Sequence, residues 1–111
     1  MLIEQVVADY LEETLELPAF PEKPTNPPEE YILVEKTGSS AENYINSATV
    51  AIQSYAGSLY KAAALNEKVK GAMNGLSVLD EISSSKLNTD YNFTNTDKKQ
   101  YRYQAIYDLV Y

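Results

Sequence analysis

The stretch "QYRYQAIYDLVY", residues 100–111, decides the fold of this 111-residue chain. Its side chains alternate between two faces without a break. The first face carries the tyrosines, as Tyr101, Tyr103, Ala105, Tyr107, Leu109 and Tyr111, and the second carries Arg102, Gln104, Ile106, Asp108 and Val110. A period of two in aromatic and β-branched residues is typical of a β-strand. We therefore predict a paired sheet strand here, although chains usually fray at their ends.

Three further segments have strand character. "YILVEKT", residues 31–37, alternates until Gly38 ends it, and "SATVAIQSY", residues 47–55, alternates after a polar loop over residues 38–46. Strands joined by so short a loop most economically pair antiparallel. Residues 78–93 form a weaker strand, because neither face is convincingly apolar and the central serines indicate a bulge or partial exposure.

Two segments repeat their apolar residues every three or four positions, which predicts helices. The first covers residues 2–17, and Pro18 stops it. The second begins after Ser58, a suitable N-cap, and runs to about Asn74. Its inward stripe comprises Leu59, Ala62, Leu65, Val69, Ala72 or Met73, and Leu76. The pair Asn74-Gly75 predicts a left-handed cap at its end.

These elements predict a single domain, residues 1–111, of the α+β class. Their order is α-β-β-α-β-β, which a four-stranded, mostly antiparallel sheet with the helices packed on one face accommodates. The domain then has three parts: an N-terminal helix (2–17), a proline-rich connector (18–30) and an α/β body (31–111).

The connector holds all five prolines of the sequence, and such a run fits neither a helix interior nor a central strand. We expect an extended segment that crosses the body. Because Pro21 and Pro24 satisfy P-x-x-P, recognition by an aromatic groove is the alternative. The candidate contact residues are Pro21, Pro24, Pro27 and Pro28, and we expect them to touch a sheet edge or a neighbouring subunit more than solvent.

The composition argues against several classes of function. The net charge of −7 disfavours unaided binding of nucleic acid or of an anionic membrane. The chain lacks cysteine and histidine, which removes thiolate chemistry and the commonest general base and metal ligand. No acidic pair, glycine-rich phosphate loop or calcium loop has the required spacing. We therefore expect no enzymatic activity, no cofactor, no metal and no membrane segment.

The tyrosines of residues 100–111 are the remaining candidates for function. A core position is one interpretation, but each buried hydroxyl needs a hydrogen-bond partner. A protein–protein interface is the other, because tyrosine is enriched there, and a division along the strand is a third. Base stacking has only Lys98, Lys99 and Arg102 to support it. The candidate interface residues are Tyr101, Tyr103, Tyr107 and Tyr111.

The middle of the chain resembles a family of small phage morphogenesis proteins. The similarity lies in "YILVEKTG" (31–38), "ATVAIQSYA" (48–56) and "SLYKAAALNEKV" (58–69), and it covers about half of the sequence. The family comprises the tail terminator and minor capsid proteins, which join head and tail, of long-tailed phages of Gram-positive bacteria.

The resemblance implies a structural protein of the virion, without activity or cofactor, that is assembled in the host cytoplasm. Such proteins form a ring, usually a hexamer, between the tail tube protein and the head-connector protein. DNA passes through the channel without specific binding. Two alternatives stay open: a head-side connector adaptor or stopper, and, from another class, a monomeric acidic protein-binding module.

Overall fold

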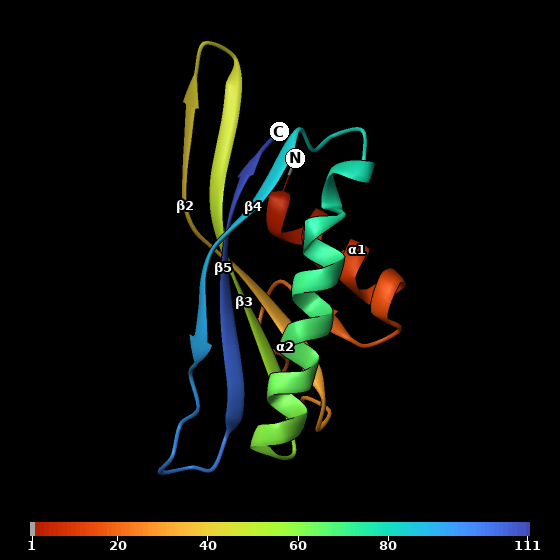
Figure 1. Cartoon of the computed structure of the whole chain (residues 1–111), viewed down its shortest axis with the longest axis vertical. Helices are drawn as coiled ribbons and strands as arrows, with labels where there is room; N and C mark the ends of the chain where they lie inside the picture. Colours follow the sequence, from red (N-terminus) through yellow and green to blue (C-terminus); the bar gives the residue numbers. More distant parts are fainter. Residues whose placement is uncertain (1) are drawn as a thin grey trace.

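The computed structural model describes residues 2–111 and has the predicted mixed α+β architecture. Its elements, in order, are α1 (Ile3–Leu15), β1 (Ala19–Phe20), β2 (Tyr31–Glu42), β3 (Ile45–Ala56), α2 (Leu59–Asn74), the 3-10 helix η1 (Leu76–Val78), β4 (Ser84–Asn92) and β5 (Tyr101–Val110). Both helices lie on the same side of the sheet (Figure 1). The helix positions and their common side therefore agree with the sequence-based prediction.

The sheet has five strands in the order β1-β2-β3-β5-β4, so the prediction of four strands was wrong. The extra strand, β1, is a two-residue segment of the connector that pairs parallel with β2. The Ile32 N–H also donates to the Pro18 carbonyl oxygen at 2.9 Å. All other pairings are antiparallel, as predicted. So short a strand carries no periodic signal, which is why the sequence did not reveal it.

The main core lies between the helices and the sheet. Alternate residues of the three central strands face α1 and α2 and are buried: Ile32 and Val34 on β2, Ala48, Val50 and Ile52 on β3, and Ala105, Tyr107 and Leu109 on β5. The helices contribute Ile3, Val7 and Leu11 from α1, and Leu65, Val69 and Met73 from α2. The period-two pattern of residues 100–111 therefore identified the strand, and the structure places the middle of its tyrosine-bearing face in the core.

The strands β2 and β3 are longer than predicted. Gly38 does not end β2, because the extra residue Thr37 forms a bulge and the ladder resumes at Gly38 and continues to Glu42. The predicted loop over residues 38–46 is instead a hairpin with a two-residue turn. Asn43 and Tyr44 occupy this turn with φ values of 52° and 65°, the conformation that favours tight hairpin turns.

Two further boundaries differ from the predictions. Strand β4 begins at Ser84 rather than near Val78, because η1 and a turn occupy the preceding residues. Its register shift lies between Leu87 and Thr89 and not at the serines. Helix α2 starts as predicted, since the Ser58 side chain accepts the Lys61 N–H at 3.2 Å. Its C-cap Gly75 has φ −98°, so the predicted left-handed cap is absent and the chain continues into η1.

Candidate assembly surface

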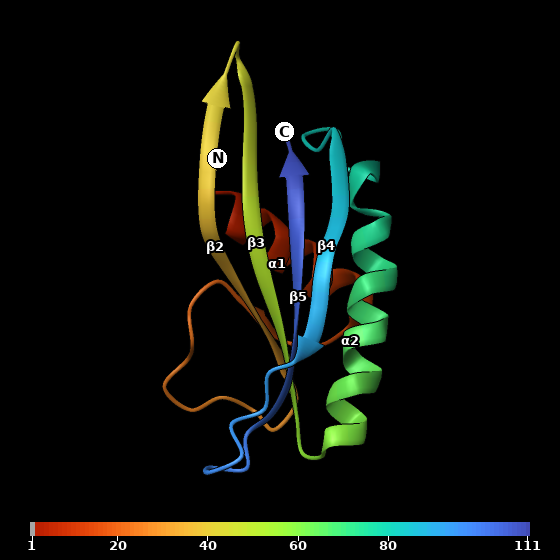
Figure 2. The same ribbon diagram turned by 60° about the vertical axis from the view of Figure 1, so that its left-hand side comes forward.

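The hairpin formed by β2 and β3 extends beyond the rest of the sheet. Residues 38–46 form the end of β2, a two-residue turn and the start of β3, and we call this segment the arm. Its outer part, residues 41–46, projects past the ends of β4 and β5, as both views show (Figures 1 and 2). Every residue from Glu35 to Asn46 is exposed, on both faces of the hairpin. An isolated two-stranded hairpin is marginally stable in water, so the arm gains little from its own contacts.

The tip of the arm presents two apolar side chains to solvent. Tyr44, in the turn, is 104 % exposed, and Ile45, the first residue of β3, is 56 % exposed. Five of the other seven residues of the arm are glycine, serine or asparagine, and the Ser40 and Ser47 hydroxyls lie 2.7 Å apart across it. A protruding aromatic residue beside an isoleucine is typical of a contact point that is buried on association. The sequence-based loop prediction did not reveal this surface.

The end of β5 is held at the base of the arm. The Tyr111 N–H donates to the Asn46 carbonyl at 2.9 Å, and the Asn46 N–H donates back to Tyr111 at 3.2 Å. The Tyr111 side chain is half-buried and packs against the core. The prediction of a paired strand rather than a loose tail is confirmed.

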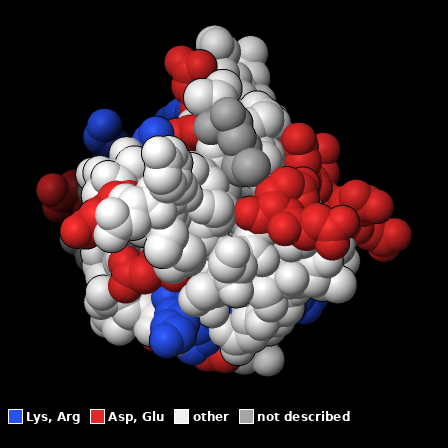
Figure 3. Space-filling view, turned by 90° about the horizontal axis from the view of Figure 1, so that it is seen from above, with Lys and Arg blue, Asp and Glu red and all other residues white. Residues whose placement is uncertain are grey.

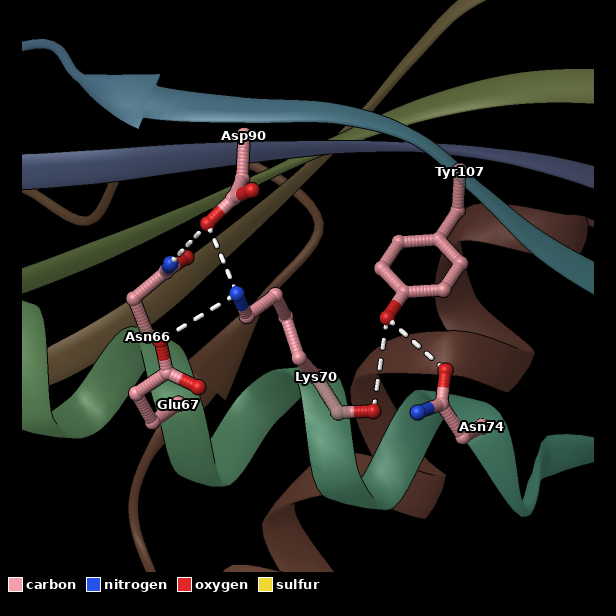
Figure 4. Close-up of polar contacts among 6 residues, drawn as sticks. All are labelled: Asn66, Glu67, Lys70, Asn74, Asp90 and Tyr107. Atoms are coloured by element: carbon pink, nitrogen blue, oxygen red, sulfur yellow. Dashed lines mark hydrogen bonds and ion pairs between the residues drawn. The ribbon is translucent and has the colours of Figure 1, made fainter.

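The three tyrosines of β5 lie in environments that differ from one another and from that of Tyr111, which follows the strand. Tyr107 is fully buried in the core, so its side chain cannot serve as an interface residue on the surface of the folded domain. Its hydroxyl lies 3.3 Å from the Lys70 carbonyl and 3.2 Å from Asn74 Oδ1 (Figure 4). Burial raises the pKa of Tyr107 above its ordinary value. Tyr101 and Tyr103 are half-buried.

A polar cluster joins α2 to β4 next to Tyr107. Asp90 accepts hydrogen bonds from Lys70 at 3.0 Å and from Asn66 at 2.8 Å, and Glu67 lies 3.2 Å from Lys70 (Figure 4). The hydrogen bond from Lys70 lowers the pKa of Asp90, and the same contact raises the pKa of Lys70. Every charge in this cluster has a partner, which is the arrangement of a structural contact.

The face of the sheet opposite the helices carries a polar network. Tyr55 donates to Gln53 at 2.9 Å, Gln53 donates to Gln104 at 2.8 Å, and Gln104 in turn donates to the Tyr91 hydroxyl. Arg102 completes it, with one guanidinium N–H on Tyr55 and another on the Phe93 carbonyl. The network crosses β3, β5 and β4 and ties these strands together. Long-range partners of this kind are not visible in the sequence.

The connector contacts the sheet through few of its residues. Phe20 makes a T-shaped contact with Tyr31, and the Tyr31 ring stacks on Tyr55 with centroids 4.4 Å apart. Lys23 lies over the Tyr55 ring. Burial, with Tyr55 beside it, raises the pKa of Tyr31 to about 12. Pro21 and Pro24 are half-buried, whereas Pro27 and Pro28 are exposed. Within this chain the predicted contact with the sheet edge therefore rests on the first half of the connector.

Acidic side chains gather on one side of the molecule. They come mainly from α1 and its C-cap, where Asp9, Glu12, Glu13 and Glu16 are exposed. Asp9 and Glu13 border a shallow hollow of about 230 Å³ together with Glu81. The view from above shows this side red and almost free of basic residues (Figure 3). Among residues 2–111, no group of acids, His or Cys is arranged to hold a metal ion.

Comparisons with known proteins add no family. No family model matches the sequence, and no curated protein matches it. No helix within residues 2–111 is both long and apolar enough to cross a bilayer. The arm, the free edges of the sheet and the acidic side are thus the features from which a function can be inferred.

Proposed function

We propose that this chain is a structural protein of long-tailed phages, a tail terminator whose ring caps the tail tube, stops its elongation and offers a surface to the head connector. The observation that carries this proposal is the arm. It displays Tyr44 and Ile45 at its tip and is exposed along both faces. Such a segment contributes little to the monomer, and its chemistry suits burial against another protein.

A ring needs a heterologous interface, in which one patch docks on a different patch of its neighbour. The arm is one such patch, and it lies on one end of the elongated molecule, whose extents are 45 × 25 × 25 Å. The resemblance of residues 31–69 to tail terminators supports a hexamer located in the virion. The net charge of −7 supports a channel that DNA passes without binding, because like charges repel.

Electron microscopy of phage particles made without this protein tests the proposal. A terminator predicts overlong tails that are not joined to heads, and adding the protein in trans restores normal tails. Heads that leak DNA would instead identify a connector stopper or adaptor. The acidic protein-binding module would be favoured if particles made without the protein are normal, and if the protein forms no ring either in solution at any concentration or on tails.

A further inference from the structure

The sheet has two edges with unpaired backbone groups, and the unpaired segments lie at the same position along the strands. At one end of the strand order, β1 covers β2 only at Ile32 and Leu33, which leaves the β2 edge free from Val34 to Glu42. At the other end, β4 has no partner beyond β5. Unpaired strand edges are templates for pairing with another chain.

The register aligns these two free segments across the sheet. Ser39 pairs with Ala48, Ala48 with Leu109, and Leu109 with Ser85. Ser39 and Ser85 therefore lie on one rung, that is, one line of paired residues across the sheet. The next rung runs from Ser40 through Ser47 and Val110 to Ser84. A copy placed beside the first without any shift along the strands therefore brings Gly38–Ser40 next to Ser84–Lys86.

The direction of the strands and the backbone groups also fit. Because β2–β3, β3–β5 and β5–β4 are all antiparallel, β2 and β4 run in opposite directions, and a neighbouring copy would add an antiparallel pair. Asn46 exchanges both of its backbone hydrogen bonds with Tyr111. The alternation of an antiparallel ladder then directs the N–H groups of Ala41, and of Ser39 two residues earlier, toward the free edge.

The side chains on these rungs are compatible with close approach. Gly38 would lie opposite Lys86, where the absence of a side chain leaves room for the lysine. Glu35 is two rungs from Lys86 on the same face, which is the diagonal position at which opposite charges attract across a strand pair. The arm's own edge, Gly38–Glu42, contains neither lysine nor proline, the residues that usually protect a free edge.

We propose that the free edge of β2 at Gly38–Ser40 in one copy pairs with Ser84–Lys86, at the start of β4, in the next copy. A continuous antiparallel sheet then links the subunits. The two edges lie at opposite ends of one sheet and at one level, so the contact is heterologous and repeats without a rise along the strands. A heterologous contact without a rise closes into a ring when the rotation between neighbours divides a full turn, and the proposed ring assembly requires that rotation. The inference rests on the proposed ring assembly and names the surfaces that form it.

Engineered cysteines test this pairing directly, because the natural sequence has none. Ser40 and the partner's residue at position 84 would form a non-hydrogen-bonded pair, the closer of the two antiparallel pair types. In the double variant Ser40→Cys with Ser84→Cys, oxidation of the assembled ring should produce a ladder of covalent oligomers on a denaturing gel. The matched control, Ser40→Cys with Thr89→Cys, places the second thiol on a distant rung and should give no ladder.

A second pair of variants removes the hydrogen bond rather than adding a link. Ser39→Pro deletes an N–H that points to the neighbour, and Ser39→Ala keeps it. Negative-stain microscopy and light scattering should show rings for the alanine variant and their loss for the proline variant, with unchanged circular dichroism. If wild-type rings form but the ladder is absent, or Ser39→Pro still assembles, edge pairing is wrong and the ring proposal survives. A wild type that never assembles, even on tails, overturns both.

Discussion

The body around Tyr107 and the arm belong to the same antiparallel sheet but obtain their order in different ways. At Tyr107 the sheet is covered by α2, the ring is buried and the hydroxyl has partners on two helical residues. In the arm the same ladder continues for residues 38–46 with both faces exposed. The difference separates residues that maintain the fold from residues that are free to serve assembly.

The largest effect is expected from a charge in the body. Leu65 is buried between α2 and the sheet, so Leu65→Asp places an unpaired charge in the core and should cost about 4 kcal/mol or more, enough to unfold the domain. Circular dichroism and thermal melting measure this. Tyr44→Asp, which adds the same charge to the arm tip, is the matched control and should melt as the wild type does. A normally melting Leu65→Asp variant would mean that α2 packs through another face.

A smaller loss is expected when only the Tyr107 hydroxyl is removed. Tyr107→Phe keeps the buried ring but leaves Asn74 Oδ1 and the Lys70 carbonyl without this donor, which should cost about 1–2 kcal/mol. Denaturant unfolding gives the value. The half-buried Tyr101 has no such partners among the side-chain hydrogen bonds of residues 2–111, so Tyr101→Phe should be close to neutral. Equal losses in the two variants would contradict the division of the tyrosines.

The Asp90–Lys70 contact predicts a dependence of stability on pH. The pKa of Asp90 is lower in the folded protein than in the unfolded chain, so its contribution is present at neutral pH and is lost as the pH falls through the folded pKa. Because the pair is partly exposed, Asp90→Asn should cost up to about 1 kcal/mol at neutral pH. The gap between wild type and variant should close in acid. A gap that stays constant with pH would assign the loss to packing.

The smallest effect on stability is expected at the arm tip. Tyr44→Ser removes a fully exposed side chain and should change the free energy of unfolding by less than about 0.5 kcal/mol. Under the proposed function the same variant should weaken ring assembly or capping of tails, which size-exclusion chromatography and electron microscopy would show. Tyr60→Ser, at an exposed position on α2, is the control for losing a surface tyrosine. If both variants assemble equally well, the tip is not a contact.

The parts of the fold that could be predicted are the long segments with periodic apolar residues. The parts that could not be predicted depend on pairing between distant strands. The period of two in residues 100–111 identified β5 but left its buried face open. The stripe containing Leu65 and Val69 identified α2 and its buried face, although Leu59, which was also predicted to face inward, is exposed. The sequence could not show that Gly38 continues a strand, because the bulge at Thr37 depends on the ladder with β3. Nor could it reveal the two-residue β1.

The candidate site was less predictable than the fold for the same reason. Tyrosine-rich character pointed to β5, but burial of Tyr107 follows from the position of α2, which a strand pattern does not contain. Conversely, five of the nine arm residues are glycine, serine or asparagine, a composition typical of a loop. Only the pairing of Ser39–Glu42 with Ile45–Ala48 makes it a projecting surface.

The measurement that tests the separation of body and arm most directly is a shortened arm. Excising Ala41, Glu42, Ile45 and Asn46 and changing Tyr44→Gly leaves an Asn-Gly turn between Ser40 and Ser47, a sequence suited to the same two-residue turn. The variant loses the two Asn46–Tyr111 backbone hydrogen bonds but otherwise only exposed residues, so it should unfold within roughly 8 °C of the wild type, yet fail to form rings or cap tails in the same preparation. A shortened protein that assembles normally, or one that no longer folds, would contradict the account.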